Sequence, residues 1–384
     1  MPKTTALRSG LPIFPPEIVD TIIEEIDRPV TLRACSLVCR SWVPASRHKA
    51  YSSICIFDGG DLAKFLELVS SPTNTFGDVL KTLKVRHCYS DLSTLLSRLP
   101  YLESLVLEES SISEGLTLDP TCMPGIKSLE FSYTFFSLPV FYEFLSLFPT
   151  LKSLTLGEGI HFTKECTGVG LAGPHLDLDS LAITIELSTQ WLTWLSAGAA
   201  PPRPRTLELK IYELDAPITA RISEYLRLLN VDLKHLRISS YKRFDHLLDF
   251  STNTALQSIT ISGPIEVVHH SPEHENVYRW DIFVSPDLPQ LLRRFNTPDL
   301  EELILKNSVH TTSGRVTSYV APHGSASMVE LGEALELPSY ARMKRLRFES
   351  PGSREAADVI EAQIVDKLPD SAAPAAQFIL TTEW

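Results

Sequence analysis

The chain has 384 residues with 43% hydrophobic and 21% charged side chains, an ordinary globular balance, and a formal net charge of −12. This charge argues against nucleic acid as the main partner, because affinity for a phosphate backbone comes largely from clustered Lys and Arg. No apolar run is long enough for a membrane span, and the N-terminal residues lack the apolar core of a signal peptide. We therefore expect a soluble intracellular protein, cytoplasmic or nuclear, without a membrane partner.

The length allows two or three average domains, or one small domain joined to an elongated one. The six cysteines are too few and too scattered for a disulfide framework, so we expect buried free thiols in a reducing compartment. Cys35 and Cys39 are four residues apart and are expected on one face of a helix.

Residues 11–56 predict three short amphipathic helices. The first is expected to open at Pro15, Pro16 and Glu17, because proline is tolerated in a first helical turn and a carboxylate favours the positive helix end. Its apolar residues recur every four positions and form one stripe, at Ile18, Ile22 and Ile26.

A break near Pro29 precedes the second predicted helix, which has Thr31 as its N-cap. Pro44 is expected to end this helix, and residues 46–51 to supply a third helical turn. The second helix is expected to carry Leu32, Cys35, Val38, Cys39 and Trp42.

This segment resembles an F-box. The resemblance rests on the opening and on the VCRSW run, at Phe14, Pro15, Glu17, Ile18, Leu32, Ser36, Val38, Cys39, Arg40 and Trp42. Phe14 departs from the family, which usually has Leu there. The resemblance implies docking onto a Skp-type adaptor, which bridges to a cullin ubiquitin ligase. It implies adaptor contacts at Phe14, Pro15, Glu17, Ile18, Ile22, Leu32, Val38, Cys39 and Trp42.

The size of the segment is a separate reason to expect a partner. A unit of about 40 residues is near the lower limit for independent folding, so it should retain apolar surface that a partner covers. The alternative is an ordinary three-helix core without a partner, which amphipathic helices alone would favour. The proline-rich opening combined with the VCRSW run favours the F-box.

After residue 56, one phrase recurs ten times: apolar, two residues, apolar, one residue, apolar. Seven of the nine start-to-start intervals lie between 22 and 29 residues, in or beside the length of one leucine-rich repeat. The phrase places two apolar side chains on one face of a short strand, and helical phrases lie between strands. The phrases start at Leu80, Leu102, Ile126, Leu151, Leu178, Pro204, Leu233, Leu256, Leu300 and Met343.

The chain beyond residue 56 therefore resembles an irregular leucine-rich-repeat array. Each strand-plus-helix unit is too small to bury its apolar side alone, so the units are expected to stack. The predicted fold class is α/β: an F-box domain at 11–56, then at 57–384 a solenoid with a parallel sheet on its concave face and helices outside. A doubly wound α/β domain is the alternative, but the repeated strand formula and the lack of a Gly-rich phosphate turn count against it.

Two stretches interrupt the repeat, near 263–290 and 308–340, and are expected to form loops or an added hairpin. At the C-terminal end, residues 355–368 predict a helix and residues 375–381 a last strand, which together would cap the core.

Two patterns resemble ligand sites but fit loops better. Residues 168–173 match G-x-G-x-x-G, yet no strand directly precedes them and Pro174 follows, so a loop between repeats is expected. Residues 269–275 contain three His and two Glu, but neither Cys pairs nor an HExxH pattern accompanies them, which favours a solvated loop. No hydrolase, Walker A or kinase motif occurs. We therefore expect no enzyme activity, no metal and no cofactor.

The candidate target-binding surface is the concave side of the strands, opposite the core. Its middle is small and hydroxyl-rich while charge collects toward its ends, so a partner could approach closely and be steered by charge. A merely solvated sheet face is the alternative. The candidate residues are Arg86, Glu108, Glu130, Thr155, Thr184, Glu208, Lys210, Arg237 and Thr260.

Together these patterns predict the substrate-recognition subunit of a Skp–cullin–F-box ubiquitin ligase, which binds an unidentified target protein and carries out no chemistry itself. Two other functions compete with this prediction. One is a leucine-rich-repeat interaction scaffold with no ligase role, and the other is an enzyme built on a different α/β fold.

Overall fold

The computed structural model describes residues 15–71, 77–87, 92–112, 125–162, 174–185, 195, 201–212, 216–240, 248–270, 279–312, 324–351, 358, 361–362, 368 and 376–381. The chain forms two compact units, an N-terminal unit of residues 1–110 and 116–126 and a C-terminal unit of residues 111–115 and 127–384. Both units are α/β with parallel strands. Within the described ranges, no helix has the length and apolar character that crossing a bilayer would require.

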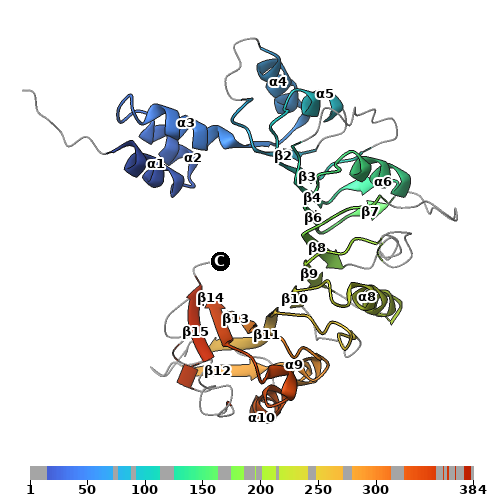
Figure 1. Cartoon of the computed structure of the whole chain (residues 1–384). Coiled ribbons are helices and arrows are strands. Elements are labelled where there is room, and N and C mark those ends of the chain that lie inside the picture. Colours follow the sequence, from blue (N-terminus) through green and yellow to red (C-terminus); the bar gives the residue numbers. More distant parts are fainter. Residues whose placement is uncertain are drawn as a thin grey trace, which may run out of the picture. The chain divides into compact units, whose positions relative to one another are not determined.

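The N-terminal unit begins with three helices, α1 (Pro16–Glu24), α2 (Pro29–Cys35) and α3 (Val43–Ser52) (Figure 1). Each has a proline in its first turn, where the missing N–H leaves no hydrogen bond unmade. The helices share a small core of Val19, Ile23, Leu32 and Cys35, against which Ile26, Trp42, Ala45 and Ala50 pack.

Three local predictions for this segment were wrong. Thr31 lies inside α2 instead of capping it. The helix ends at Cys35, so residues 38–42 form turns and Cys39 is exposed. Pro44 lies in the first turn of α3 instead of ending α2. Proline is excluded from a helix interior but accepted in a first turn, so it marks a helix start as readily as an end.

The sheet of the N-terminal unit contains three parallel strands, β1 (Ser53–Ile56), β2 (Thr82–Arg86) and β3 (Ser104–Glu108). The connecting helices are α4 (Gly59–Ser70) and α5 (Leu92–Ser97). Alternate strand residues such as Leu83 and Leu105 are fully buried, as the period of two in a strand requires. Asp58 caps α4 by accepting the N–H of Asp61 at 2.7 Å.

The main sheet of the C-terminal unit consists of parallel strands that lie side by side in chain order. A doubly wound sheet reverses its strand order at a switch point, so that alternative does not fit. The strands are β4 (Ser128–Ser132), β6 (Ser153–Leu156), β8 (Ser180–Ile185), β9 (Thr206–Ile211), β10 (His235–Ser240), β11 (Ser258–His270), β13 (Glu302–Thr312), β14 (Arg345–Pro351) and β15 (Ala376–Thr381).

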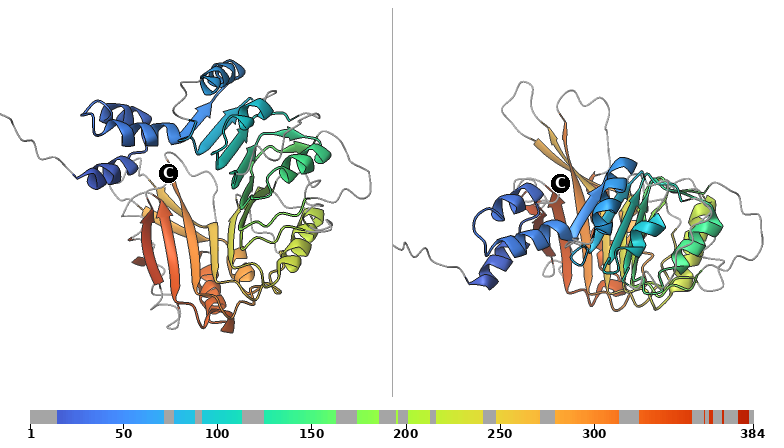
Figure 2. Two further views of the ribbon diagram at one scale, coloured as in Figure 1. Left: turned by 45° about the horizontal axis from the view of Figure 1, so that its top comes forward. Right: turned by 90° about the horizontal axis from the view of Figure 1, so that it is seen from above.

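Helices cover one side of this sheet, as Figures 1 and 2 show for the C-terminal unit. They are α6 (Leu138–Ser146), α8 (Ala216–Leu229), α9 (Asp287–Leu292) and α10 (Gly324–Leu335), with a short 3-10 helix, η2 (Pro338–Tyr340). Between α6 and the sheet, the rings of Phe141 and Phe144 on the helix meet those of Phe131 on β4 and Phe136 on β5 (Phe135–Phe136), mainly edge to face. A separate parallel pair, β5 and β7 (His161–Phe162), flanks this cluster. In each unit, the side of the sheet opposite the buried alternate strand residues is termed the open face.

A backbone pattern recurs before the strands. The carbonyl of Lys152 accepts the N–H groups of Asp179 and Ser180, at 2.8 and 3.0 Å. The same arrangement recurs at the starts of other strands, where one carbonyl accepts two consecutive N–H groups from the start of the next strand. The accepting carbonyls belong to Lys81, Lys127, Lys152, Asp179, Arg205, Lys234, Gln257 and Glu301. Each of these is the second residue of a predicted phrase, so the predicted strand register is confirmed at these positions.

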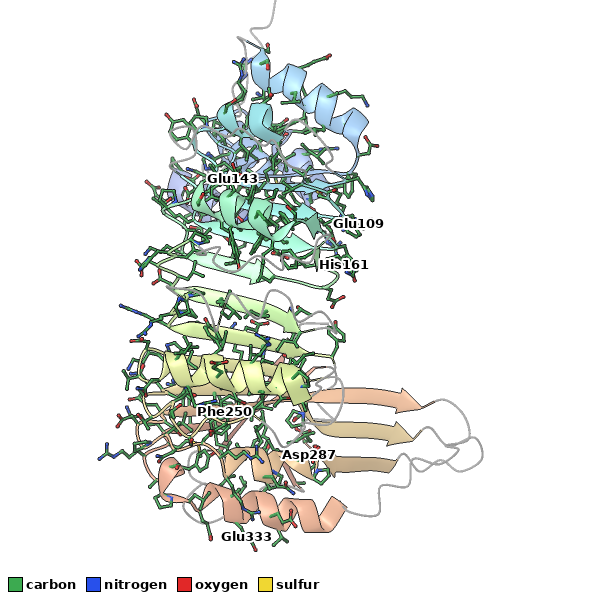
Figure 3. All side chains as sticks on the ribbon, turned by 90° about the vertical axis from the view of Figure 1, so that its right-hand side faces the viewer. Glu109, Glu143, His161, Phe250, Asp287 and Glu333 are labelled. Atoms are coloured by element: carbon green, nitrogen blue, oxygen red, sulfur yellow. The ribbon has the colours of Figure 1, made fainter. Side chains whose placement is uncertain are left out.

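A hairpin of β11 and β12 (Arg279–Val284) extends beyond the ends of the neighbouring strands. β11 continues past its neighbours to pair with antiparallel β12 and with the far end of β13, and Figure 3 shows this extension projecting beyond the other strands. Gly263, at φ 86, lies in the bulge where the register shifts, a conformation that favours glycine. The stretch near 263–290 therefore contains a hairpin. Within 308–340, residues 308–312 belong to β13 and Gly324–Leu335 form α10, so the loop or hairpin expected there was wrong for these residues.

At the C-terminal end, β15 matches the predicted last strand. Of the predicted helix at 355–368, only 358, 361 and 362 are described as helical. The Gly-rich match at 168–173 lies outside the described residues, as do residues 271–275 and the side chains of His269 and His270.

Candidate functional site

The three-helix segment exposes one apolar face of α1. Val19 and Ile23 point into the core, one turn apart. Ile18 and Ile22 each precede them by one residue, about 100° around the helix, and are 47% and 39% exposed. The predicted stripe is thus split, because Ile26 alone of its three residues packs on the core.

Three further aliphatic side chains of this segment are exposed, Val30 on α2 and Leu37 and Val38 in the turns that follow it. Ile18, Ile22, Val30, Leu37 and Val38 are termed the apolar set. Single exposed apolar residues are ordinary on protein surfaces, and here five of them lie within one small segment.

The structure divides the residues expected to contact an adaptor. Trp42 is half-buried against the core, and Phe14 lies outside the described residues. Such apolar residues were expected to divide between the helical core and the partner face, and Leu32 belongs to the core, beside Cys35 three residues away on the inward face of α2. The exposed members are Pro15, Glu17, Ile18, Ile22, Val38 and Cys39.

Polar contacts hold this segment in place. Lys49 on α3 donates to the carbonyl of Glu24 at 3.0 Å and lies 3.9 Å from Asp27, so it ties α3 to the C-terminal end of α1. Cys39 lies 3.0 Å from the hydroxyl of Ser41, and this hydrogen bond lowers the pKa of the thiol. The VCRSW run is therefore an ordered turn although it is not helical.

The open face of the N-terminal sheet places one carboxylate between two cations. Glu108 on β3 lies 2.8 Å from Lys84 Nζ and 2.5 Å from Arg86 Nε, both on β2. Burial acts to raise the pKa of Glu108, but the hydrogen bonds from Lys84 and Arg86 outweigh it and lower the pKa. The guanidinium of Arg86 also lies 5.6 Å from the centre of the Phe57 ring. The predicted residues Arg86 and Glu108 are thus brought together.

Other predicted residues meet on the open face of the C-terminal sheet. Glu208 on β9 forms loose ion pairs, at 3.8 Å, with Lys210 on the same strand and with Arg237 on β10. Glu130 on β4 is exposed and occupies the register position paired with Thr155 on β6.

Two predicted open-face residues are buried. Thr184 on β8 and Thr260 on β11 are each 6% exposed. Both have a longer side chain at a paired register position, Lys210 beside Thr184 and Arg237 beside Thr260. The expectation that these two threonines contact a target directly was therefore wrong.

The charges of β13 and β14 were not selected from the sequence. Glu302 lies 2.8 Å from Arg345 Nε and 3.5 Å from Arg347 Nη1. Glu349 lies 2.9 Å from Arg347 Nη2 and 3.3 Å from Lys306. Strand alternation does place all five on the open face, but their pairing depends on the register between strands that are 43 residues apart.

No protein-family model matches the chain, and no curated protein matches it. In the part of the chain that the structure describes, no group of three or more His, Cys, Asp or Glu side chains is placed to hold a metal ion.

A carboxylate–phenol cluster lies where β4, β6 and β9 end. Glu158 accepts hydrogen bonds from the hydroxyl groups of Tyr212 and Tyr133, the latter at 2.8 Å. Both bonds lower the pKa of Glu158, so the carboxylate is ionised at neutral pH and suits a structural tie better than proton transfer. The sequence carried no signal for this cluster, because the tyrosines lie 25 and 54 residues from Glu158.

Proposed function

We propose that the chain is the substrate-recognition subunit of a Skp–cullin–F-box ubiquitin ligase. In this proposal residues 11–56 are an F-box that docks on a Skp-type adaptor, and residues 57–384 are an irregular leucine-rich-repeat array that holds a target protein. The chain then acts by raising the concentration of the target near a ubiquitin-charged enzyme, and it needs no chemistry of its own.

The observation that carries the proposal is the exposure of the apolar set on a segment that already has a core. Ile18 and Val38, which belong to the F-box resemblance, are 47% and 63% exposed, while Val19 and Ile23 fill the core. Apolar residues that contribute nothing to the core of their own segment are expected at a protein contact surface.

Two features support the repeat assignment. Strands follow one another in chain order within each unit, which is how a stacked array of strand-plus-helix repeats is built. The recurring carbonyl that accepts two N–H groups appears at the same position of successive phrases, so the repeats share a backbone conformation as well as a sequence pattern.

Co-purification of the full chain with a Skp-type adaptor and cullin tests the proposal. The double variant Ile18→Asp/Ile22→Asp is expected to reduce adaptor capture about tenfold or more, since charged side chains would replace the apolar contact. Leu68→Asp is the matched control, because Leu68 is similarly exposed but lies on α4.

Two results would contradict the proposal: no adaptor capture by the unmodified chain, or undiminished capture by the double variant. A chain that binds a protein target but no adaptor would instead be an interaction scaffold without a ligase role.

A further inference from the structure

On the open face of the C-terminal sheet, carboxylates lie beneath the cations that pair with them. The side chains of Glu208, Glu302 and Glu349 are between 9% and 27% exposed. The cations paired with them are between 28% and 61% exposed, and they are Lys210, Arg237, Lys306, Arg345 and Arg347.

This arrangement is particular to the open face. In five ion pairs elsewhere in the described part of the C-terminal unit, the carboxylates remain between 42% and 82% exposed. Geometry gives the reason, because a glutamate is shorter than Lys or Arg. Glu302 pairs with two cations of the neighbouring β14, and Glu349 pairs with one cation of its own strand and one of β13. The carboxylates are thus held near the sheet while the longer cations reach outward.

The outer layer of this face is therefore positive in a chain of net charge −12. Across residues 206–210, 235–239, 258–262, 302–306 and 345–349, five Lys and Arg side chains occupy open-face positions against three Glu. The recessed carboxylates are already paired, so an incoming anion meets the cations first.

The cations form two groups on either side of small hydroxyl residues. Lys210 and Arg237 lie on β9 and β10, and Lys306, Arg345 and Arg347 lie on β13 and β14. The residues between the groups are Ser239, Ser258, Thr260 and Ser262. These five cations, the three glutamates Glu208, Glu302 and Glu349, and the four hydroxyl residues are termed the charged strip.

The strand register sets the separation of the two cation groups. Lys210, Ser239, Ser262 and Lys306 occupy successive paired positions, so the two lysines are three strand spacings apart. Arg237 and Arg347 are separated by the same number of strands. Three spacings amount to roughly 14 Å, a distance that about four residues of an extended peptide cover.

We infer that the charged strip binds an extended acidic segment of a partner protein, whose Asp or Glu side chains about four residues apart contact the two cation groups. The hydroxyl residues between the groups are small and leave room for the peptide backbone. Ser239, Ser258 and Ser262, which are partly exposed, can hydrogen-bond to it. The inference deepens the proposed function and rests on it for the role of this partner as the ligase target. Nucleic acid fits less well, because uncharged hydroxyl residues separate the two cation groups, whereas a nucleic-acid backbone presents a phosphate at every nucleotide.

Fluorescence anisotropy of labelled Gly/Ser peptides against the full chain tests the inference. The probe carries two Asp pairs about four residues apart, one control has Asn at those positions, and another has the four Asp side by side. We expect the spaced Asp peptide to bind most tightly and to weaken as salt rises. Arg237→Gln and Arg345→Gln should each weaken it about three- to tenfold.

Arg203→Gln is the matched control variant, because Arg203 has similar exposure but pairs with Asp232 before β10, away from the charged strip. Equal binding of the Asp and Asn peptides, an equal loss in Arg203→Gln, or tighter binding of single-stranded nucleic acid would overturn the inference. Adaptor capture is measured on the same variants. An unmodified chain that captures the adaptor but does not prefer the spaced Asp peptide counts against the charged strip alone, and an unmodified chain that binds this peptide but captures no adaptor counts against the ligase role alone.

Discussion

Arg86 on β2 and Glu108 on β3 occupy paired register positions, and the guanidinium Nε lies 2.5 Å from the carboxylate. Lys84 reaches the same oxygen at 2.8 Å from two residues earlier on β2. A carboxylate served by two cations keeps its ionised form even where burial disfavours it. The C-terminal sheet repeats this arrangement at Glu302 and Glu349, so it is a recurring feature of the open faces.

Glu108→Gln is expected to destabilise the chain by about 1 kcal/mol at neutral pH, a value that allows for solvent screening. The folded-state pKa of Glu108 is lowered, so its stabilisation is present above the unfolded-state pKa and is lost as the pH falls through the lower folded-state value. The difference between variant and unmodified chain should therefore shrink below about pH 4. Chemical denaturation across a pH series measures this, with Glu67→Gln on the exposed side of α4 as control. A penalty that persisted unchanged in acid would contradict the assignment.

Leu154→Asp is expected to cost about 3 to 5 kcal/mol of unfolding free energy, because it buries an unpaired charge. Leu154 is fully buried at the centre of β6. Ser153→Asp is the matched control, since Ser153 precedes it on the same strand and faces the other side, and it should change stability by less than about 0.5 kcal/mol. Denaturant midpoints of the two variants compare the faces directly. Equal midpoints would show that the strand register is wrong there.

Gly159→Ala is expected to destabilise the C-terminal unit by about 1 to 3 kcal/mol. Gly159 has a φ of 65°, and an added Cβ would lie 2.4 Å from the ring of Tyr133. The change would therefore strain the backbone and displace a tyrosine that donates to Glu158. Gly59→Ala at the start of α4 is the control, because nothing lies within 4 Å of its added Cβ. Thermal melts should fall for the first variant alone, and a melt unchanged by Gly159→Ala would exclude the close approach.

Tyr340→Phe is expected to cost about 1 to 2 kcal/mol by leaving a buried carbonyl without its donor. The Tyr340 hydroxyl donates to the carbonyl of Leu292 at 2.7 Å, and burial raises the pKa of this phenol. Tyr101→Phe is the control, since Tyr101 is half exposed. Denaturation at constant pH measures both variants, and a Tyr340→Phe cost no larger than that of the control would show that the hydrogen bond contributes little.

The faces of the strands were predictable from the phrases alone. A strand alternates its side chains, so Leu83 and Val85, like Leu154 and Leu156, had to share one side whatever packed against it. The structure buries all four. The same alternation placed Arg86 and Glu108 on the open face. Residues 218–229, one of the helical phrases between strands, lie within α8.

The three-helix segment was less predictable in detail. Ile18, Ile22 and Ile26 repeat every four residues, but Val19 and Ile23 repeat at the same spacing. A helix of 3.6 residues per turn accepts either set as its inner face. The choice depends on α2, whose Leu32 and Cys35 share the core with Val19 and Ile23, and on α3, whose Ala45 and Ala50 pack against that core.

By itself the sequence determined the period of each segment and, through that period, which residues share a side of a strand. Only the tertiary structure decided which apolar face of α1 is buried and which cations pair with Glu302 and Glu349. It also decided that the hydroxyl groups of two tyrosines donate to Glu158. Periodicity is a local property of the chain. The pairings instead depend on strand register and packing between segments tens of residues apart, which no short sequence window contains.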